Sequence, residues 1–126
     1  MPPIRSVDPG ALLARTWRLD SGVPVRLRLA RPADAAAIRS LLARCGAEAS
    51  DLVVGRLVRA DPRREVTLCA TTPLDGREEI VGVGAIAFDG GEPHTVSCDD
   101  RMGADGARLV DAALRELVRR RARRVA

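Results

Sequence analysis

The sequence predicts an α+β domain, in which helices flank a mixed, mostly antiparallel sheet of about six strands. Residues 25–29 (Val-Arg-Leu-Arg-Leu) alternate strictly between apolar and polar side chains, as a strand with one buried face does. The spacing i, i+3, i+4 and i+7, which marks one face of a helix, is followed by Ile38, Leu41, Leu42 and Cys45. Residues 80–88 are apolar apart from their glycines, which favours a central strand buried on both faces. Strands interleaved with helices in this order favour an α+β arrangement.

The first half of the chain is predicted to contain a hairpin and two helices. Residues 1–22 form an N-terminal extension and the start of the hairpin, with Asp8-Pro9 capping a short helical turn, and residues 23–126 form the main domain. Asp34 is a suitable N-cap for the first long helix, which Gly46 ends. Ser50 or Asp51 can open a second helix that stops before Asp61-Pro62.

The second half is predicted to hold three strands and one long helix. Residues 65–70 precede the central strand and residues 94–98 follow it, with turns at 73–76 and 89–91. The last helix has one apolar face, made by Leu109, Val110, Ala113, Leu114, Leu117 and Val118. Its polar face carries Arg108, Asp111, Arg115, Glu116 and Arg119.

Composition limits the class of protein. A chain of 126 residues fits one ordinary domain, and no apolar run approaches the roughly 20 residues of a membrane span. The cysteines lie in apolar stretches without metal-ligand spacing, as buried, reduced thiols do: Cys45, Cys69 and Cys98. His94 is the single histidine, so no zinc site is expected. We therefore expect a cytoplasmic protein without a metal or a membrane partner.

The net charge of +4 accompanies five arginines crowded between residues 119 and 124. Such a cluster can contact nucleic-acid phosphates, but it also suits the C-terminal end of a helix and is usually solvated. Aromatic side chains for base stacking are scarce, and Trp17 is expected to cap the core. A nucleic-acid partner is therefore the least favoured interpretation.

A glycine-containing turn lies between the last strand and the last helix, over residues 99–106. The first amides of a helix lack partners inside it and point along the positive end of its dipole, which suits an anion. Small residues allow a ligand to approach the backbone closely. The turn thus predicts a phosphate or pyrophosphate site.

The turn Arg101-Met102-Gly103-Ala104-Asp105-Gly106 fits the pattern Arg/Gln-x-x-Gly-x-Gly/Ala. With Leu27-Arg28-Leu29-Ala30-Arg31-Pro32-Ala33-Asp34 and Ile80-Val81-Gly82-Val83-Gly84 in the right order before it, the chain resembles the GNAT superfamily of N-acetyltransferases over about residues 23–125. The lead-in hairpin and Gly46-Ala47-Glu48-Ala49-Ser50 are faintly similar to bacterial protein-lysine acetyltransferases of that superfamily.

The resemblance implies acetyl transfer from acetyl-CoA to an amine acceptor. By position, the backbone of Val96 and Cys98 would pair with pantetheine, and Arg101 would lie beside the phosphates. The amides that would hold the pyrophosphate belong to Met102, Gly103, Ala104, Asp105, Gly106 and Ala107. Glu92 is the nearest match to the family's general base, and His94 is the second.

Three features depart from the family pattern. The chain stops at Ala126, where the fifth strand of the family would begin, so we expect the C-terminal arm after the third helix to be lacking. No tyrosine is present to protonate the leaving thiolate. Asp99, Asp100 and Asp105 bring negative charge to the phosphate turn, and like charges at short range repel by about 1 kcal/mol even in water. Activity is therefore expected to be weak or to need a second chain; the alternative is a non-catalytic, degenerate domain for interaction or regulation.

Without a fifth strand, residues 94–98 form a sheet edge with unpaired backbone groups. A homodimer, or a partner chain that covers this edge, is the expected consequence.

Each candidate residue also has a structural interpretation. Cys98 is a nucleophile or, as the sequence favours, a buried structural cysteine. His94 is a base or a solvent-facing strand residue, and Glu92 is a base or a turn residue. Asp105 binds next to a phosphate or caps the final helix with its own carboxylate.

Overall fold

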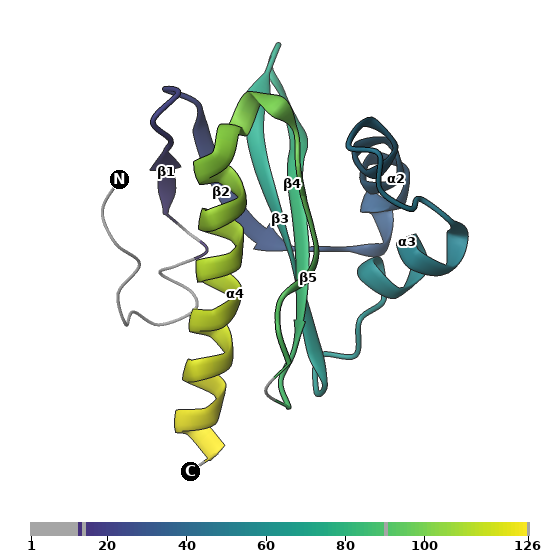
Figure 1. The fold of residues 1–126 in the computed structure, drawn as a ribbon, viewed down its shortest axis with the longest axis vertical. Coiled ribbons are helices and arrows are strands. Elements are labelled where there is room, and N and C mark those ends of the chain that lie inside the picture. Colours follow the sequence, from purple (N-terminus) through teal and green to yellow (C-terminus); the bar gives the residue numbers. More distant parts are fainter. Residues whose placement is uncertain (1–12, 14, 90, 126) are drawn as a thin grey trace.

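Five strands form one antiparallel sheet in the part of the chain that the structure describes, which is residues 13, 15–89 and 91–125 of a computed structural model (Figure 1). They lie across the sheet in chain order: β1 (Thr16–Arg18), β2 (Pro24–Leu29), β3 (Glu65–Leu74), β4 (Arg77–Ala87) and β5 (His94–Cys98). Each neighbouring pair runs antiparallel. The α+β prediction is confirmed, but the sheet has five described strands rather than about six and is not mixed.

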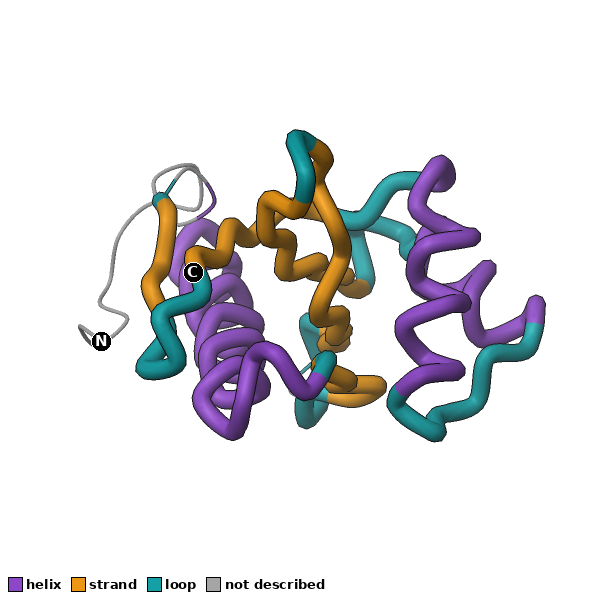
Figure 2. The backbone as a smooth tube through the Cα atoms, turned by 90° about the horizontal axis from the view of Figure 1, so that it is seen from above, coloured by secondary structure: helices purple, strands orange, loops and turns teal. Residues whose placement is uncertain are grey.

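Helices cover both faces of this sheet. α2 (Ala35–Arg44) and α3 (Asp51–Val58) lie on one face and α4 (Gly103–Val125) lies on the other, which gives three layers (Figure 2). Short 3₁₀ turns, η1 (Pro32–Asp34) and η2 (Asp100–Met102), precede α2 and α4. Among the described helices, none combines the length and the apolar character that crossing a membrane requires. The helical turn predicted at Asp8-Pro9 lies outside the described residues.

The layer between α4 and the sheet is apolar and holds the single tryptophan. Trp17 is 3% exposed and belongs to one cluster with the fully buried Leu27, Leu68 and Leu114. Each such side chain contributes about 1.5–3 kcal/mol by leaving water. Trp17 is therefore part of the core, as the sequence predicted.

Glu116 of α4 is buried, although the helical pattern places it on the polar face. Its carboxylate accepts hydrogen bonds from Arg119 Nη2 at 2.6 Å and from Arg120 Nε at 3.3 Å. A buried charge persists only when it is paired, and the two arginines of the next helical turn supply that pairing.

The layer between the sheet and α2/α3 confirms both predicted helices. Ile38, Leu41 and Leu42 are fully buried, whereas Cys45, at the end of the same stripe, is exposed. Ser50 is the N-cap of α3, where its hydroxyl accepts a hydrogen bond from the Val53 amide at 3.3 Å.

Asp34 occupies the N-cap position of α2 but does not cap it with its side chain. Its carboxylate accepts hydrogen bonds from Arg28 Nη1 and Nη2, at 2.8 and 2.9 Å, and from the Arg31 amide at 2.7 Å. The prediction that the Asp34 side chain caps this helix is thus wrong. The carboxylate binds Arg28 instead, because a bidentate arginine is a stronger partner for a carboxylate than a helix amide. This ion pair ties β2 to the start of α2.

The hairpin between β3 and β4 turns later than predicted. Pro73 and Leu74 belong to β3, and the turn consists of Asp75 and Gly76, both with positive φ (51° and 79°). A two-residue turn with both central φ values positive matches the twist of its strands, which is why Asp-Gly is favoured there.

Candidate functional site

The turn between β5 and α4 is shaped by its own acidic residues. Asp99 caps η2, where its Oδ1 accepts a hydrogen bond from the Arg101 amide at 3.0 Å. Gly103 follows with a φ of +66°, a conformation that favours glycine, and α4 begins there. The predicted phosphate turn therefore does open a long helix.

Arg101 is held between two carboxylates instead of pointing freely from this turn. Its Nη2 lies 2.9 Å from Asp99 Oδ2 and 2.8 Å from Glu79 Oε1. The guanidinium lowers the pKa of Asp99 and of Glu79 through these hydrogen bonds, and the carboxylates in turn raise the pKa of Arg101. A phosphate would have to compete with these carboxylates for Arg101.

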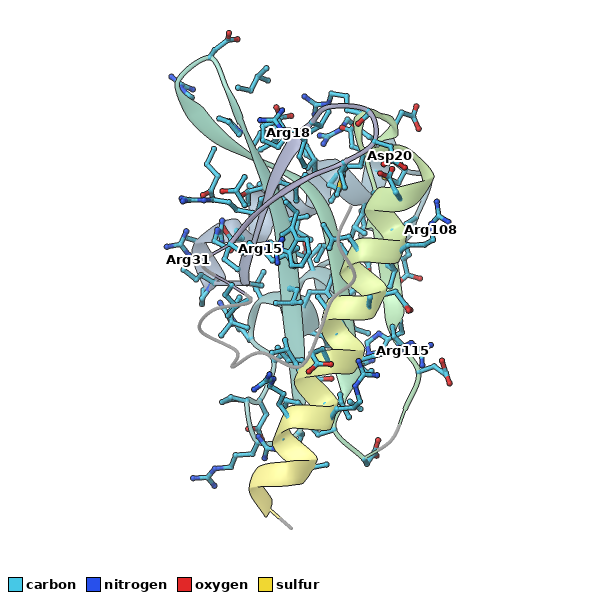
Figure 3. All side chains as sticks on the ribbon, turned by 90° about the vertical axis from the view of Figure 1, so that its left-hand side faces the viewer. Arg15, Arg18, Asp20, Arg31, Arg108 and Arg115 are labelled. Atoms are coloured by element: carbon cyan, nitrogen blue, oxygen red, sulfur yellow. The ribbon has the colours of Figure 1, made fainter. Side chains whose placement is uncertain are left out.

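Two further residues of the turn have structural partners. Gly106 is buried, and a Cβ at this position would lie 2.4 Å from Met102 Cβ, so its small size serves packing. Asp105 Oδ2 accepts a hydrogen bond from the Asp20 amide at 2.8 Å, which joins the β1–β2 turn to the first turn of α4. Asp20 is labelled in Figure 3. The carboxylate of Asp105 therefore accepts a hydrogen bond from the hairpin.

β5 has one strand neighbour, β4, within the described sheet. The carbonyl of Cys98 accepts a hydrogen bond from Cys45 Sγ at 3.3 Å, and Arg44 Nη2 lies 3.4 Å from Asp99 Oδ2, so the end of α2 meets this end of β5. The side chains of Val96 and Cys98 pack against the α4-side core. Their backbone is the part of the edge that, by the resemblance, would pair with pantetheine.

We expect Cys98 to react slowly with thiol reagents at pH 7.5. Burial raises its pKa to about 11 and that of Cys69 to about 12, so both are overwhelmingly thiols at this pH. Cys45 is exposed and should be modified at least about tenfold faster. Following reaction with Ellman's reagent, with Cys45→Ser as the control that removes the fast phase, tests this expectation. If Cys98 reacted first, its interpretation as a nucleophile would return.

The two predicted catalytic residues lie on opposite faces of the sheet. Glu92 is exposed before β5, and its Oε2 pairs with Arg115 Nη2 of α4 at 2.5 Å. His94 instead faces α3 and lines a cavity of about 250 Å³. The structure therefore separates Glu92 from His94, and they do not act on one group.

The cavity beside His94 contains two residues that sequence reasoning missed, Thr67 and Glu65. Thr67 pairs with Ala85 and Ala85 with His94 across three strands, so the three lie in one row. Thr67 is 4% exposed, and its Oγ1 has no hydrogen-bond partner among the described residues. A buried hydroxyl without a partner costs stability, and a ligand in the cavity could satisfy it.

This cavity combines groups that can accept a proton with an apolar wall. His94 and Glu65 can each accept a proton, Thr67 can donate or accept a hydrogen bond, and Val53 and Leu57 of α3 supply the apolar side. No sequence signal could identify Thr67, because its role depends on the register of three strands.

In comparisons with known proteins, no protein-family model and no curated protein sequence matches the chain.

Proposed function

We propose that this domain is a GNAT-like N-acyltransferase, which transfers an acetyl group from acetyl-CoA to an amine held in the His94 cavity. The observation that carries the proposal is the cavity itself: His94, on β5, lines it together with Thr67, whose hydroxyl has no partner within the described part of the chain. The turn that the resemblance assigns to pyrophosphate directly follows the same strand. One strand therefore leads from the proposed acceptor site to the proposed cofactor site.

The arrangement of elements supports the proposal. In order along the chain, β2, α2, α3, β3, β4, β5 and α4 match the elements that the resemblance implies, with α2 and α3 on one face and α4 on the other. Gly103 and the amides after it open α4 at the expected place.

In the proposed reaction, His94 accepts the proton that the amine loses as its nitrogen attacks the thioester carbonyl. The new C–N bond forms, the C–S bond breaks, and the thiolate of CoA takes a proton from solvent, because the sequence contains no tyrosine to provide it. Glu65 attracts the ammonium form of the amine, which loses its first proton to water before it can attack, and Thr67 orients the neutral amine by a hydrogen bond.

Acetyl-CoA binding tests the proposal most directly. Ala107→Glu places a carboxylate at the half-exposed fifth residue of α4, near the start of the helix, where it would repel the pyrophosphate, and we expect at least about a tenfold loss of affinity by calorimetry. A glutamate near the N-terminus of a helix also suits the helix dipole, so the fold should be unharmed.

Ala112→Glu is the matched control, because Ala112 is half-exposed on the same helix but lies further along it. It should bind acetyl-CoA like the parent protein. Absence of binding at millimolar acetyl-CoA, or equal losses in the two variants, would remove acetyl-CoA as the ligand of this turn.

A second candidate is a non-catalytic domain for interaction or regulation, and the ion pairs of Arg101 favour it. Asp99 and Glu79 already neutralise the one arginine that the family pattern places beside the phosphates. In that case the outer edge of β5 would bind a second copy or a partner strand. Sedimentation that shows a dimer, together with no acetyl-CoA binding, is the result expected of this candidate.

A further inference from the structure

A second hollow, of about 860 Å³, adjoins the His94 cavity. It lies between the end of α3, the segment that leads into β3, and the end of β4, and its lining includes Arg56, Arg59, Arg63 and Arg64. Arg56 and Glu65 line both hollows. A ligand of modest length could therefore reach from one to the other.

Four arginines line this hollow, together with three carboxylates, those of Asp61, Glu65 and Asp89. Asp61 accepts a hydrogen bond from the Arg63 amide and lies 3.9 Å from Arg64 Nε. The guanidinium groups of Arg56, Arg59 and Arg63 form no ion pair with any residue that the structure describes. Guanidinium groups present a planar set of donors that matches phosphate and carboxylate oxygens.

The wall of the hollow is held in place by α4. Arg121 donates hydrogen bonds to the carbonyls of Pro62 and Arg63, at 3.0 and 2.8 Å, and lies over the Phe88 ring at 4.3 Å. The Phe88 amide also bonds to the Arg64 carbonyl at 2.8 Å. The arginine-bearing segment is therefore fixed against the sheet, which lowers the entropy lost when a ligand binds.

We infer that these two hollows together bind an amine that carries a phosphate or carboxylate group. The amine lies beside Glu65, Thr67 and His94, and the anionic group lies against Arg56, Arg59 and Arg63. If this amine is the acceptor of acetyl transfer, the inference rests on the proposed function and adds the chemical class of the acceptor.

A small molecule fits the hollow better than a nucleic acid does. Nucleic-acid surfaces combine positive charge with aromatic rings on which bases stack. Phe88 is the one aromatic residue in the lining, and Arg121 covers its ring. The hollow thus offers charge without a stacking platform.

Three matched probes test the inference, each titrated into isotope-labelled protein and followed by amide chemical shifts. O-Phosphoethanolamine carries both groups, ethanolamine carries only the amine, and ethyl phosphate carries only the anion. We expect O-phosphoethanolamine to bind at least about tenfold more tightly than either of the others, with shifts at residues 56–67 and at His94.

Substitutions of the arginines test where the anionic group of the ligand binds. Arg59→Gln combined with Arg63→Gln should weaken O-phosphoethanolamine about tenfold and ethanolamine not at all, whereas Arg77→Gln, at the exposed turn between β3 and β4, should change neither. Exposed arginines at these positions leave the core untouched, and thermal melting verifies that each variant folds.

Two results would overturn the inference: ethyl phosphate binding as tightly as O-phosphoethanolamine, or O-phosphoethanolamine failing to bind while a single-stranded oligonucleotide binds with steep salt dependence. Acetyl-CoA titration of the same samples separates the two proposals. Binding of acetyl-CoA without O-phosphoethanolamine leaves the transferase and removes this acceptor class. The reverse outcome leaves an amine–anion site and removes the transferase.

Discussion

Replacing Gly84 with valine will lower the free energy of unfolding by about 3 kcal/mol. Gly84 lies on β4 directly beneath α4, and because it has no side chain, the helix packs closely on the strand there. A Cβ there would lie 2.9 Å from Val110 Cγ1, 3.2 Å from Leu114 Cδ1 and 3.2 Å from Val96 Cγ2. Valine adds two further methyl groups to this contact, so α4 must move away from the sheet. Urea denaturation followed by circular dichroism measures the loss.

Alanine substitutions at two glycines provide the control. A Cβ added at Gly55 in α3 would have no atom within 4 Å, so Gly55→Ala should stabilise the protein by up to about 1 kcal/mol. Gly84→Ala should instead destabilise the protein. Adding Val110→Ala to Gly84→Ala should restore part of the lost free energy of unfolding. Equal effects at Gly55 and Gly84 would show that α4 does not pack on β4 as closely as the structure has it.

Replacing Asp34 with asparagine will cost about 2–3 kcal/mol at pH 7, because it removes the bidentate carboxylate of Arg28 and leaves this guanidinium paired with the half-exposed Glu78 alone. The side chains of Asp34 and Arg28 are 8% and 22% exposed, so solvent screens the pair only in part. Chemical denaturation of the two proteins at the same pH gives the difference.

The effect of Asp34→Asn should fade in acid. The hydrogen bonds from Arg28 hold the pKa of Asp34 below the 3.8 of an unperturbed aspartate, so the folded state favours the carboxylate. The contribution is fully present above about pH 4 and is lost as the pH falls through the lower, folded-state pKa. The two proteins should therefore converge in stability as the pH falls below 3.8 and through that lower pKa.

Asp51→Asn is the matched control for this ion pair. Asp51 pairs with Arg39 at the surface, where its side chain is 93% exposed, and such pairs contribute roughly 0–1 kcal/mol. A loss at Asp34 no greater than that at Asp51 would show that the Arg28 pair does not hold β2 to the start of α2.

Periodicity and caps were sufficient to predict most elements of the fold. The bounds of the last strand, His94–Cys98, were predicted as observed, and α3 begins after Ser50, as its capping side chain indicates. These features depend on residues that are neighbours in the chain, so a local pattern contains them. The β3–β4 turn was misplaced because Pro73 is kept in its strand by pairing with Glu78 across the hairpin, which a local pattern does not contain.

The candidate site was predictable only in part. His94 was named as a candidate base, and it does line a cavity, but Glu92, preferred from the sequence, faces Arg115 on the other side of the sheet. Glu92 and His94 are only two residues apart in the chain, but their side chains leave the backbone toward opposite faces of the sheet. Thr67, a further polar residue of the cavity, lies on β3, two strands across the sheet from the strand of His94.

The sequence by itself determined the order of the helices and strands, the apolar face that each one buries, and the position of the turn before α4. Only the tertiary structure decided the partners of the charged and polar side chains: Arg101 with Asp99 and Glu79, Asp105 with the Asp20 amide, and Thr67 with an open cavity. The physical reason is that burial follows a periodicity along the chain, whereas an ion pair or a hydrogen bond depends on strand register and helix placement. The turn's glycine pattern was therefore readable from the sequence, but the smallness of Gly106 is explained by its contact with Met102.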